Sequence, residues 1–374
     1  MLLRQSHWPP TTTATNRRTK MASALQENDH AIHDEEAAKF RQFDVVNDCS
    51  DHYFANSKHA AYKRACFTST GNGALYKKIM QDWRILEKDL PESIYVRAYA
   101  GRIDLLRAAI IGARETPYHD GLFFFDFAFP CDYPNRPPLV YYHSHGLRLN
   151  PNLYSGGAVC LSLLNTWFGT ENEKWNPSVS TVLQVLVSLQ GIVLNDKPYY
   201  NEPGFKLSGS WETYNEDAFL LSCKTMLSLL QNPPRNFEAF VVGHFCERAK
   251  SILSACKAYQ NGHVRVGLYR DENRPICMSE IQASDKFKKS MDKLYKDLLV
   301  GFAKNGVSNL QNDLIEEFGD EIENIDLKQK RVTHEKKKLG ESCEIIVYLK
   351  SILGLNKGGK KLKNNANGIK MNTS

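Results

Sequence analysis

The most regular hydrophobic pattern in the chain is an alternation that runs from residue 122 to residue 130. An extended strand turns successive side chains to opposite faces, so residues two apart share one face. We expect a half-buried strand that packs against a helix through this face. The residues of that face are Phe123, Phe125, Phe127 and Phe129.

Apolar residues at helical spacing precede this strand, beginning near Gly73. Three other apolar runs, 94–100, 105–113 and 139–144, are predicted to be strands. Together with the first strand they form a four-stranded antiparallel meander behind an N-terminal helix, which is an α+β fold. The predicted helix ends at Leu90-Pro91, and its buried face consists of Leu75, Ile79, Trp83 and Leu86.

The second half of the chain is predicted to be helical. Residues 179–193 form a strongly apolar helix, and residues 211–230 form another, which the Asn232-Pro233-Pro234 stretch ends. Two later sets of apolar residues at spacings of three and four predict the buried faces of two more helices. The first set is Val242, Phe245, Ala249, Ile252 and Cys256, and the second is Phe287, Met291, Leu294, Leu298 and Phe302.

These elements divide the chain into four parts. Residues 1–69 are expected to be a largely disordered N-terminal extension, within which an apolar and acidic segment, Phe40 to Phe54, either docks on the core or binds a partner. Residues 70–232 form the core, residues 233–350 a helical C-terminal extension, and residues 351–374 a basic, disordered tail. The lysines near the C-terminus are interpreted as solvated charge, with a nuclear address or contact with an anionic surface as the alternative.

Composition narrows the class of protein. A hydrophobic fraction of 42% supports a core, and a net charge of +6 is too modest to indicate nucleic-acid binding. No apolar run approaches the ~18–20 residues that a membrane span requires. Nine cysteines occur without a Cys-x-x-Cys pair, which indicates neither a zinc ribbon nor a redox dithiol and fits a cytoplasmic and/or nuclear protein. The first 26 residues lack acids, which fits a disordered tail, with a transit peptide as the alternative.

Candidate chemistry concentrates around Cys160. An Asn150-Pro151-Asn152 turn and a Gly156-Gly157 pair precede this cysteine, and an apolar run follows it. Proline presets φ and glycine permits close backbone approach, so the stretch can expose a thiol in a shallow groove beside an amide side chain. A thiol accepts acyl groups and an asparagine amide can donate to an oxyanion. The pattern indicates acyl transfer through a thioester.

Several motifs in a fixed order strengthen this interpretation. A Thr-Pro-Tyr-x-x-Gly turn at 116–121 and a Tyr-Pro-x-x-Pro-Pro loop at 133–138 come before the cysteine, and a Trp-x-Pro element at 175–177 comes after it. With the Pro-Asn pair and the cysteine, they resemble the ubiquitin-conjugating enzyme family over residues 70–210. The chain looks most like the large, extended members, some of which combine conjugating enzyme and ligase. It has Asn150 where the family has a mainly structural histidine.

The resemblance implies a function and roles for individual residues. Cys160 would accept ubiquitin from an activating enzyme and pass it to a lysine of a substrate protein, alone or with a ligase. Asn152 would donate to the oxyanion, or hold the loop, or both. Asp196 is the acidic candidate for taking the proton of the incoming lysine, although Lys197 stands directly before the proline there. No cofactor is implied.

Three further features bear on the site. His143 and His145 precede the loop at the end of a strand and are interpreted as local hydrogen-bonding residues. Their His-x-His spacing resembles a metal pair, but no other ligands cluster with it, so no metal site is expected. Asn135 and Arg136 stand where the family often has a bulky apolar residue that ligases contact. Residues 168–174 lie within an insertion before Trp175, whose polar composition predicts an exposed loop beside the active-site groove that selects the acceptor or ligase.

Two alternatives to this function remain open. The first is a conjugating enzyme for another ubiquitin-like modifier, which the sequence does not distinguish from a ubiquitin enzyme. The second is a non-catalytic scaffold with the same fold, and the presence of Cys160 argues against it, since such variants usually lack the cysteine.

Overall fold

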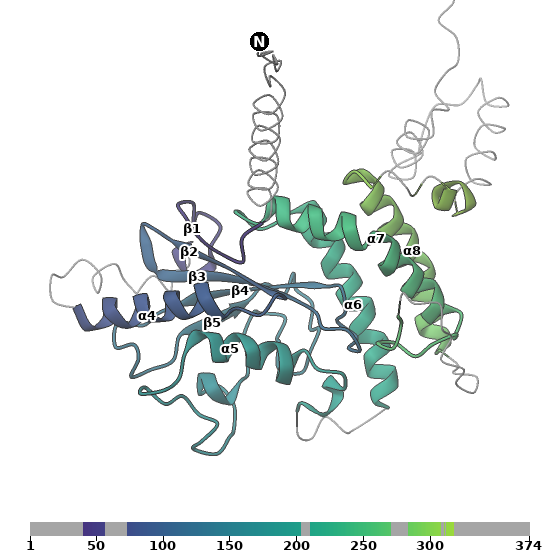
Figure 1. Cartoon of the computed structure of the whole chain (residues 1–374). Helices are drawn as coiled ribbons and strands as arrows, with labels where there is room; N and C mark the ends of the chain where they lie inside the picture. Colours follow the sequence, from purple (N-terminus) through teal and green to yellow (C-terminus); the bar gives the residue numbers. More distant parts are fainter. Residues whose placement is uncertain are drawn as a thin grey trace, which may run out of the picture.

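A computed structural model describes residues 40–56, 73–202, 210–270, 283–307, 310 and 312–317. A central sheet is flanked by helices α4 and α5, and helices α6, α7 and α8 form a second helical layer (Figure 1). The predicted basic tail, residues 351–374, lies outside the described residues. Within the described part, no helix combines the length and apolar character that crossing a membrane would need.

The predicted meander is confirmed. Strands β2 (Ile94–Tyr99), β3 (Arg102–Ile111), β4 (Leu122–Ala128) and β5 (Leu139–Tyr142) pair antiparallel in this order. Strand β3 begins three residues earlier than the apolar pattern predicted. Arg102 pairs with Tyr99 across a tight hairpin, and the register shifts between Ala98 and Tyr99.

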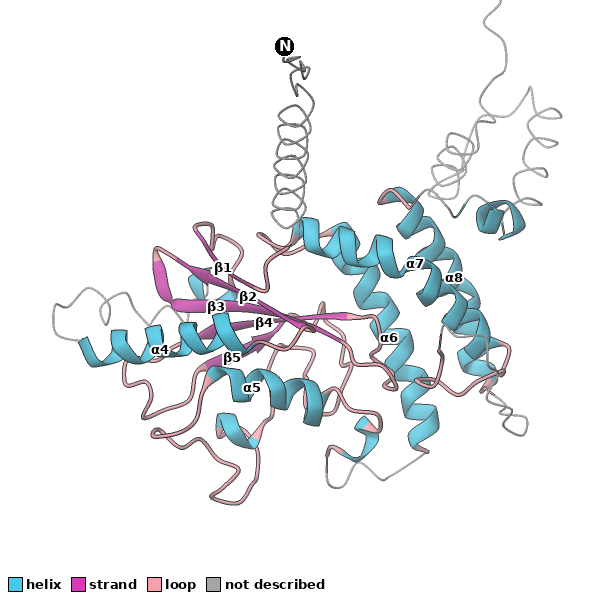
Figure 2. Ribbon diagram, viewed as in Figure 1, coloured by secondary structure: helices cyan, strands magenta, loops and turns pink. Residues whose placement is uncertain are grey.

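The apolar and acidic segment at residues 40–54 docks on the core, which is the first of the two alternatives that the sequence left open. Strand β1 (Phe43–Val46) adds to the sheet parallel to β2, and the short helix α2 (Tyr53–Asn56) follows it (Figure 2). The sheet therefore has five strands in the order β1-β2-β3-β4-β5. The first part of the sheet comes from a stretch that precedes the predicted core.

Strand β4 is buried on both faces, so the prediction of a half-buried strand was wrong. The predicted face packs with α4 (Gly73–Asp89) and α5 (Val182–Ser188) in one hydrophobic cluster. The opposite face carries Phe124, which joins the cluster of the C-terminal helices, and its ring lies 5.1 Å from that of Phe237. Phe237, more than 100 residues away in the sequence, thus covers the face of β4 that the alternation alone did not predict to be buried.

The apolar stretch at residues 179–193 becomes helical three residues later than expected. Thr181 caps helix α5, and its side chain accepts a hydrogen bond from the Gln184 amide while the Gln184 side chain accepts one from Thr181. This reciprocal pair satisfies two amide groups at the helix start. Val179 lies before the cap and is exposed. The helix continues as a wider turn, η2 (Leu189–Val193).

Three C-terminal helices complete the fold, α6 (Trp211–Gln231), α7 (Glu238–Gln260) and α8 (Asp285–Lys304). Both predicted stripes lie on buried faces of α7 and α8, except that Val242 is only partly buried. The same cluster includes Ala109, Leu122 and Phe124 of the sheet. The C-terminal helices therefore share a core with the sheet.

Candidate active site

The loop that carries Cys160 runs along the end of strand β5. The Tyr142 amide donates to the Gly157 carbonyl at 2.8 Å, and the Ser144 hydroxyl donates to the Ser155 carbonyl at 2.5 Å. These bonds hold the loop against the sheet just before the cysteine. The loop continues into a short turn, η1 (Ser162–Leu164).

Asn150, which replaces the histidine of the family motif, is fully buried and satisfied. Its amide donates to the Tyr118 hydroxyl at 2.9 Å and to the Val193 carbonyl at 2.7 Å. Its side-chain oxygen accepts from the Asn152 backbone amide at 2.8 Å. Asn150 therefore ties the cysteine loop to the predicted Thr-Pro-Tyr turn and to the end of η2.

Asn152 and Cys160 are joined by two hydrogen bonds. The Cys160 amide donates to the Asn152 carbonyl at 2.9 Å, and the Asn152 side-chain amide donates to the Cys160 carbonyl at 3.0 Å. The Asn152 side chain is 7% exposed, and its Oδ1 is buried with no hydrogen-bond partner in the described part of the chain. Asn152 thus makes the loop-holding contact that the sequence allowed.

The Cys160 thiol is partly exposed and lies beside a cluster of Arg148, Tyr154 and Glu202. Burial raises the pKa of Cys160 above its ordinary value, and Glu202 raises this pKa further. The Tyr154 hydroxyl, through a hydrogen bond, and the Arg148 charge act in the opposite direction. The guanidinium of Arg148 lies 4.5 Å from the Tyr154 ring centre and 3.2 Å from a Glu202 oxygen, so the three residues form one unit.

Glu202 lies beside Cys160 and was not among the candidates selected from the sequence. Asp196, the predicted acid, is exposed, and its carboxylate makes no hydrogen bond or ion pair among the described residues. Its backbone carbonyl accepts a hydrogen bond from Asn215 at 2.8 Å. Glu202 acts on the pKa of Cys160, whereas Asp196 does not. The sequence contained a signal for Glu202. The position considered for the acid directly precedes a proline, and Glu202 precedes Pro203 just as Lys197 precedes Pro198.

The insertion before Trp175 forms an ordered, exposed loop. The Ser162 hydroxyl donates to the Phe168 carbonyl at 2.6 Å, and the Thr170 amide donates to the Glu173 carboxylate at 2.6 Å. The Phe168 side chain itself is 88% exposed. At the end of the insertion, the Trp175 indole donates to the Pro134 carbonyl at 2.6 Å. The loop thus connects the turn after Cys160 to the proline-rich loop.

The two histidines near the loop lie in different environments. His143 Nε2 lies 2.9 Å from a carboxylate oxygen of buried Asp126, whereas His145 is exposed and has a φ of 50°. Among the described residues, no group of three or more His, Cys, Asp or Glu side chains could hold a metal ion. Cys131 is disulfide-bonded, and the described cysteines with free thiols are Cys49, Cys160, Cys223, Cys246 and Cys256.

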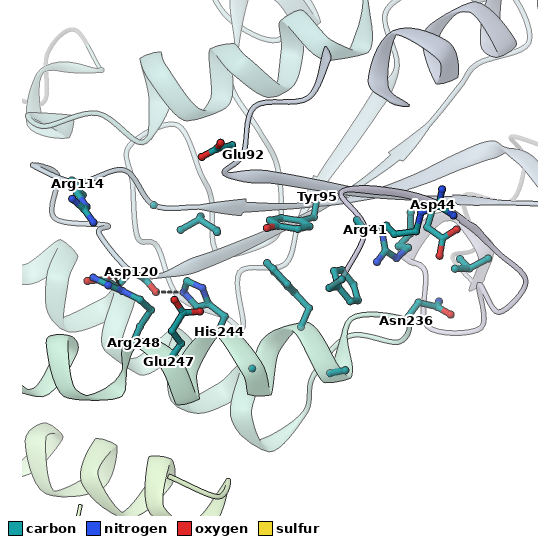
Figure 3. A pocket seen from close by; sticks show the side chains of 18 residues that line it. Arg41, Asp44, Glu92, Tyr95, Arg114, Asp120, Asn236, His244, Glu247 and Arg248 are labelled. Atoms are coloured by element: carbon teal, nitrogen blue, oxygen red, sulfur yellow. Dashed lines mark hydrogen bonds and ion pairs between the residues drawn. The ribbon is translucent and has the colours of Figure 1, made fainter. Parts of the chain in front are cut away.

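A separate groove of about 1070 Å³ lies between strands β1 and β2 and helix α7 (Figure 3). Tyr95 lies in its middle, and the His244 ring contacts the Asp120 carbonyl at 2.8 Å on one side. Arg248 donates to the Asp120 carboxylate at 2.7 Å on the same side. The lining residues do not include any from the loop of residues 150–161.

The fold and the cysteine loop define a ubiquitin-conjugating type of domain. A family model described as "Ubiquitin-conjugating enzyme" matches residues 78–218. The protein named "Putative ubiquitin-conjugating enzyme E2 38" of Arabidopsis thaliana is 45% identical over 278 residues, which are 72% of this chain and 83% of that protein. This chain therefore belongs to the ubiquitin-conjugating enzyme family.

Other relatives are much longer than this chain. "Probable ubiquitin-conjugating enzyme E2 24" of Arabidopsis thaliana is 49% identical over 290 residues, 76% of this chain but 30% of that protein. The human "Dual E2 ubiquitin-conjugating enzyme/E3 ubiquitin-protein ligase BIRC6" is 35% identical over 245 residues, 59% of this chain and 5% of that protein. The resemblance to large, extended members is confirmed. A solved structure of human ubiquitin-conjugating enzyme E2 G1 is 28% identical and covers 32% of this chain and 91% of its own, with a TM-score of 0.28.

Proposed function

We propose that Cys160 accepts ubiquitin as a thioester from an activating enzyme and transfers it to a lysine of a substrate protein, alone or with a ligase. The observation that carries the proposal is the free, partly exposed thiol in a loop that Asn152 closes with two hydrogen bonds. The odd number of cysteines favours a cytoplasmic and/or nuclear place of action, whereas the disulfide at Cys131 counts against it. The motif order and the family membership of the chain support the same chemistry.

In the first step, the Cys160 thiolate attacks the carbonyl carbon of the ubiquitin thioester, and the thiolate of the activating enzyme leaves. The raised pKa of Cys160 keeps the thiol mostly protonated at neutral pH. Thioester exchange moves the acyl group between two sulfurs of similar leaving ability, so it needs no dedicated base. A protonated resting thiol also resists oxidation, since the thiolate is the species that oxidants attack.

In the second step, the substrate amine attacks the Cys160 thioester, and an isopeptide bond forms as the Cys160 thiolate leaves. The tetrahedral intermediate carries an oxyanion, which one positioned donor stabilises by ~10²–10³ in rate. A side-chain amide has two N–H groups. One Asn152 N–H donates to the Cys160 carbonyl, and the second remains for the oxyanion.

The attacking lysine must also lose a proton, because its ordinary pKa is about 10.4. We assign this role to Glu202 in place of Asp196. Glu202 acts on the pKa of Cys160, and its ion pair with Arg148 holds the carboxylate at the edge of the site. Arg148 also neutralises part of its charge, which fits a carboxylate that orients the amine.

The test is a charging assay with a panel of activating enzymes, modifiers and ATP, resolved on gels with and without reductant. A reductant-sensitive ubiquitin adduct that Cys160→Ala abolishes, and that Cys160→Ser converts into a reductant-resistant oxyester, is the expected result. An adduct with a different modifier alone would identify the first alternative function. If no adduct forms with any modifier, the non-catalytic scaffold is the remaining function.

A further inference from the structure

Three consecutive residues of the N-terminal segment are anchored on the sheet. Arg107 Nη1 donates to both carboxylate oxygens of Asp51 at 2.8 Å. The Tyr53 amide donates to Asp126 Oδ2 at 2.8 Å. Between them, His52 is fully buried and contacts a β3 carbonyl at 3.0 Å. Arg107 of β3 and Asp126 of β4 are opposite each other in the sheet, and Arg107 Nε lies 2.6 Å from Asp126 Oδ1. These contacts fix residues 51–53 on strands β3 and β4.

The C-terminal half of the chain holds the same turn from another side. The Arg235 amide donates to Asp51 at 3.0 Å, and the Asn236 side chain donates to the Asp48 carbonyl at 2.7 Å. Both donors belong to the connection between α6 and α7. Residues 51–53 are therefore fixed by two parts of the chain that are far apart in sequence.

From this platform, the Tyr53 ring stacks on Tyr141 of strand β5. The ring centres are 3.5 Å apart and the rings are within 4° of parallel. His143 closes a second side of the Tyr141 ring, edge-on at 5.4 Å. Strand β5 ends the described sheet, so the stacked ring supports a strand that has a neighbouring strand on one side.

The Tyr141 ring in turn lies directly against Gly157 of the cysteine loop. A Cβ atom at Gly157 would lie 2.0 Å from Tyr141 Cε2, and Gly157 has a φ of 89°, which favours glycine. The Gly157 carbonyl accepts the Tyr142 amide at 2.8 Å. The backbone of the loop, three residues before Cys160, therefore rests on a ring whose position Tyr53 helps to fix.

We propose that residues 51–53 form a buttress of the cysteine loop, in which Tyr53 is a positioning residue that acts on Cys160 through Tyr141 and Gly157. The proposal rests on the thioester chemistry proposed above. Without the stacked ring, Tyr141 gains freedom to rotate, and Gly157 loses the surface that it packs against. A displacement of about 1 Å at a reacting group can slow a reaction by ~10²-fold.

A merely stabilising role predicts something different. In that case, any aromatic residue of the same segment would have the same effect on the site when removed. Phe43 of β1 offers the matched control, because it is partly buried and packs edge-on against Trp83 of α4, with ring centres 6.2 Å apart. Among the described residues, no ring contact joins Phe43 to Tyr141.

The experiment compares Tyr53→Ala, Tyr53→Phe and Phe43→Ala in the full chain. We measure ubiquitin transfer from the charged activating enzyme, hydrogen exchange of amides 154–160, and alkylation of the Cys160 peptide by iodoacetamide. Tyr53→Ala should lower kcat of transfer about tenfold with little change in KM, and speed exchange in the loop. Tyr53→Phe should leave kcat and the exchange rate at their wild-type values, because it keeps the ring. Phe43→Ala should lower the melting temperature without these effects.

A double substitution adds a check on the route. Tyr53→Ala combined with Tyr141→Ala should be no slower than Tyr141→Ala alone, since contacts in one chain of effect are not additive. Equal transfer, exchange and alkylation for Tyr53→Ala and Phe43→Ala would overturn the proposal. If the wild-type chain fails to accept ubiquitin, the proposed function fails, while exchange and alkylation still decide on the buttress.

Discussion

The side-chain amide of Asn152 donates to the backbone carbonyl of Cys160 at 3.0 Å, and the Cys160 amide donates back to the Asn152 carbonyl at 2.9 Å. The two residues are eight positions apart, and their two hydrogen bonds close the loop between them. A nearly buried side chain therefore holds the cysteine backbone before any acyl group arrives. This geometry makes the contribution of Asn152 to loop structure separable from its contribution to the oxyanion.

Asn152→Ala should leave thioester formation on Cys160 largely intact and slow discharge to free lysine by ~10²-fold, the usual effect of losing one oxyanion donor in the second step. Removing the loop bond should also lower the free energy of unfolding by about 1 kcal/mol. Single-turnover discharge of charged enzyme and thermal melts measure the two effects. If discharge matches the wild type while the fold is intact, Asn152 serves the loop alone.

Replacing each candidate acid by its amide distinguishes the role of Glu202 from that of Asp196. Glu202→Gln should slow discharge to lysine about tenfold at pH 7 and less at pH 9, where more of the amine is already deprotonated. Asp196→Asn is the matched control and should discharge normally. Rates of discharge against pH for both variants provide the measurement. A slow Asp196→Asn beside a normal Glu202→Gln would return the role to the residue that the sequence first indicated.

Much of the fold could be predicted from the sequence, and the reasons for the remainder are physical. Alternation and spacing are local properties, so they predicted β4 and the buried faces of α7 and α8. They could not predict that Phe237 covers Phe124, because that contact depends on where a distant helix lies. The docking of residues 40–56 was open for the same reason, since its anchors are the backbone of β2 and the charged residues Arg107 and Asp126 of other strands.

The site divides in the same way. The placement of Asn152 beside Cys160 follows from a Pro-Asn turn and a glycine pair within ten residues. Glu202 lies 42 residues beyond Cys160, and its place depends on how the loop after η2 folds back. Asp196 was selected from the sequence because related enzymes have an acidic residue in the loop after the central helix, and the position of Glu202 beside Cys160 could not be read from the sequence.

The pKa of Cys160 should depend on Tyr154. Burial raises this pKa, so iodoacetamide alkylation of the Cys160 peptide should still increase with pH beyond the range of an ordinary thiol. Tyr154→Phe removes a hydrogen bond that lowers the pKa, and should shift the alkylation midpoint to higher pH. Glu202→Gln removes a charge that raises the pKa, and should shift the midpoint lower. Midpoints that move in the opposite directions would contradict this electrostatic arrangement.

The insertion at residues 168–174 should select the acceptor or ligase without supporting the core. Its exposed Phe168 is presented beside the turn that follows Cys160, because the Phe168 carbonyl is tied to Ser162. Its other internal contacts, between Glu171 and Lys174 and between Thr170 and Glu173, are exposed and add little stability. Deleting residues 168–174 should change the free energy of unfolding by less than ~1 kcal/mol, and Phe168→Ala by less still.

Both variants should charge Cys160 normally but discharge to protein substrates at altered rates, since an exposed aromatic side chain is suited to contact a partner. Discharge to free lysine is the internal control, because it needs no protein surface and should be unchanged. The measurement is a pair of discharge time courses, with free lysine and with ligase and substrate, for each variant. A large fall in melting temperature on deletion would show that the loop supports the core. Unchanged protein discharge across several ligases would leave Phe168 without the selective role.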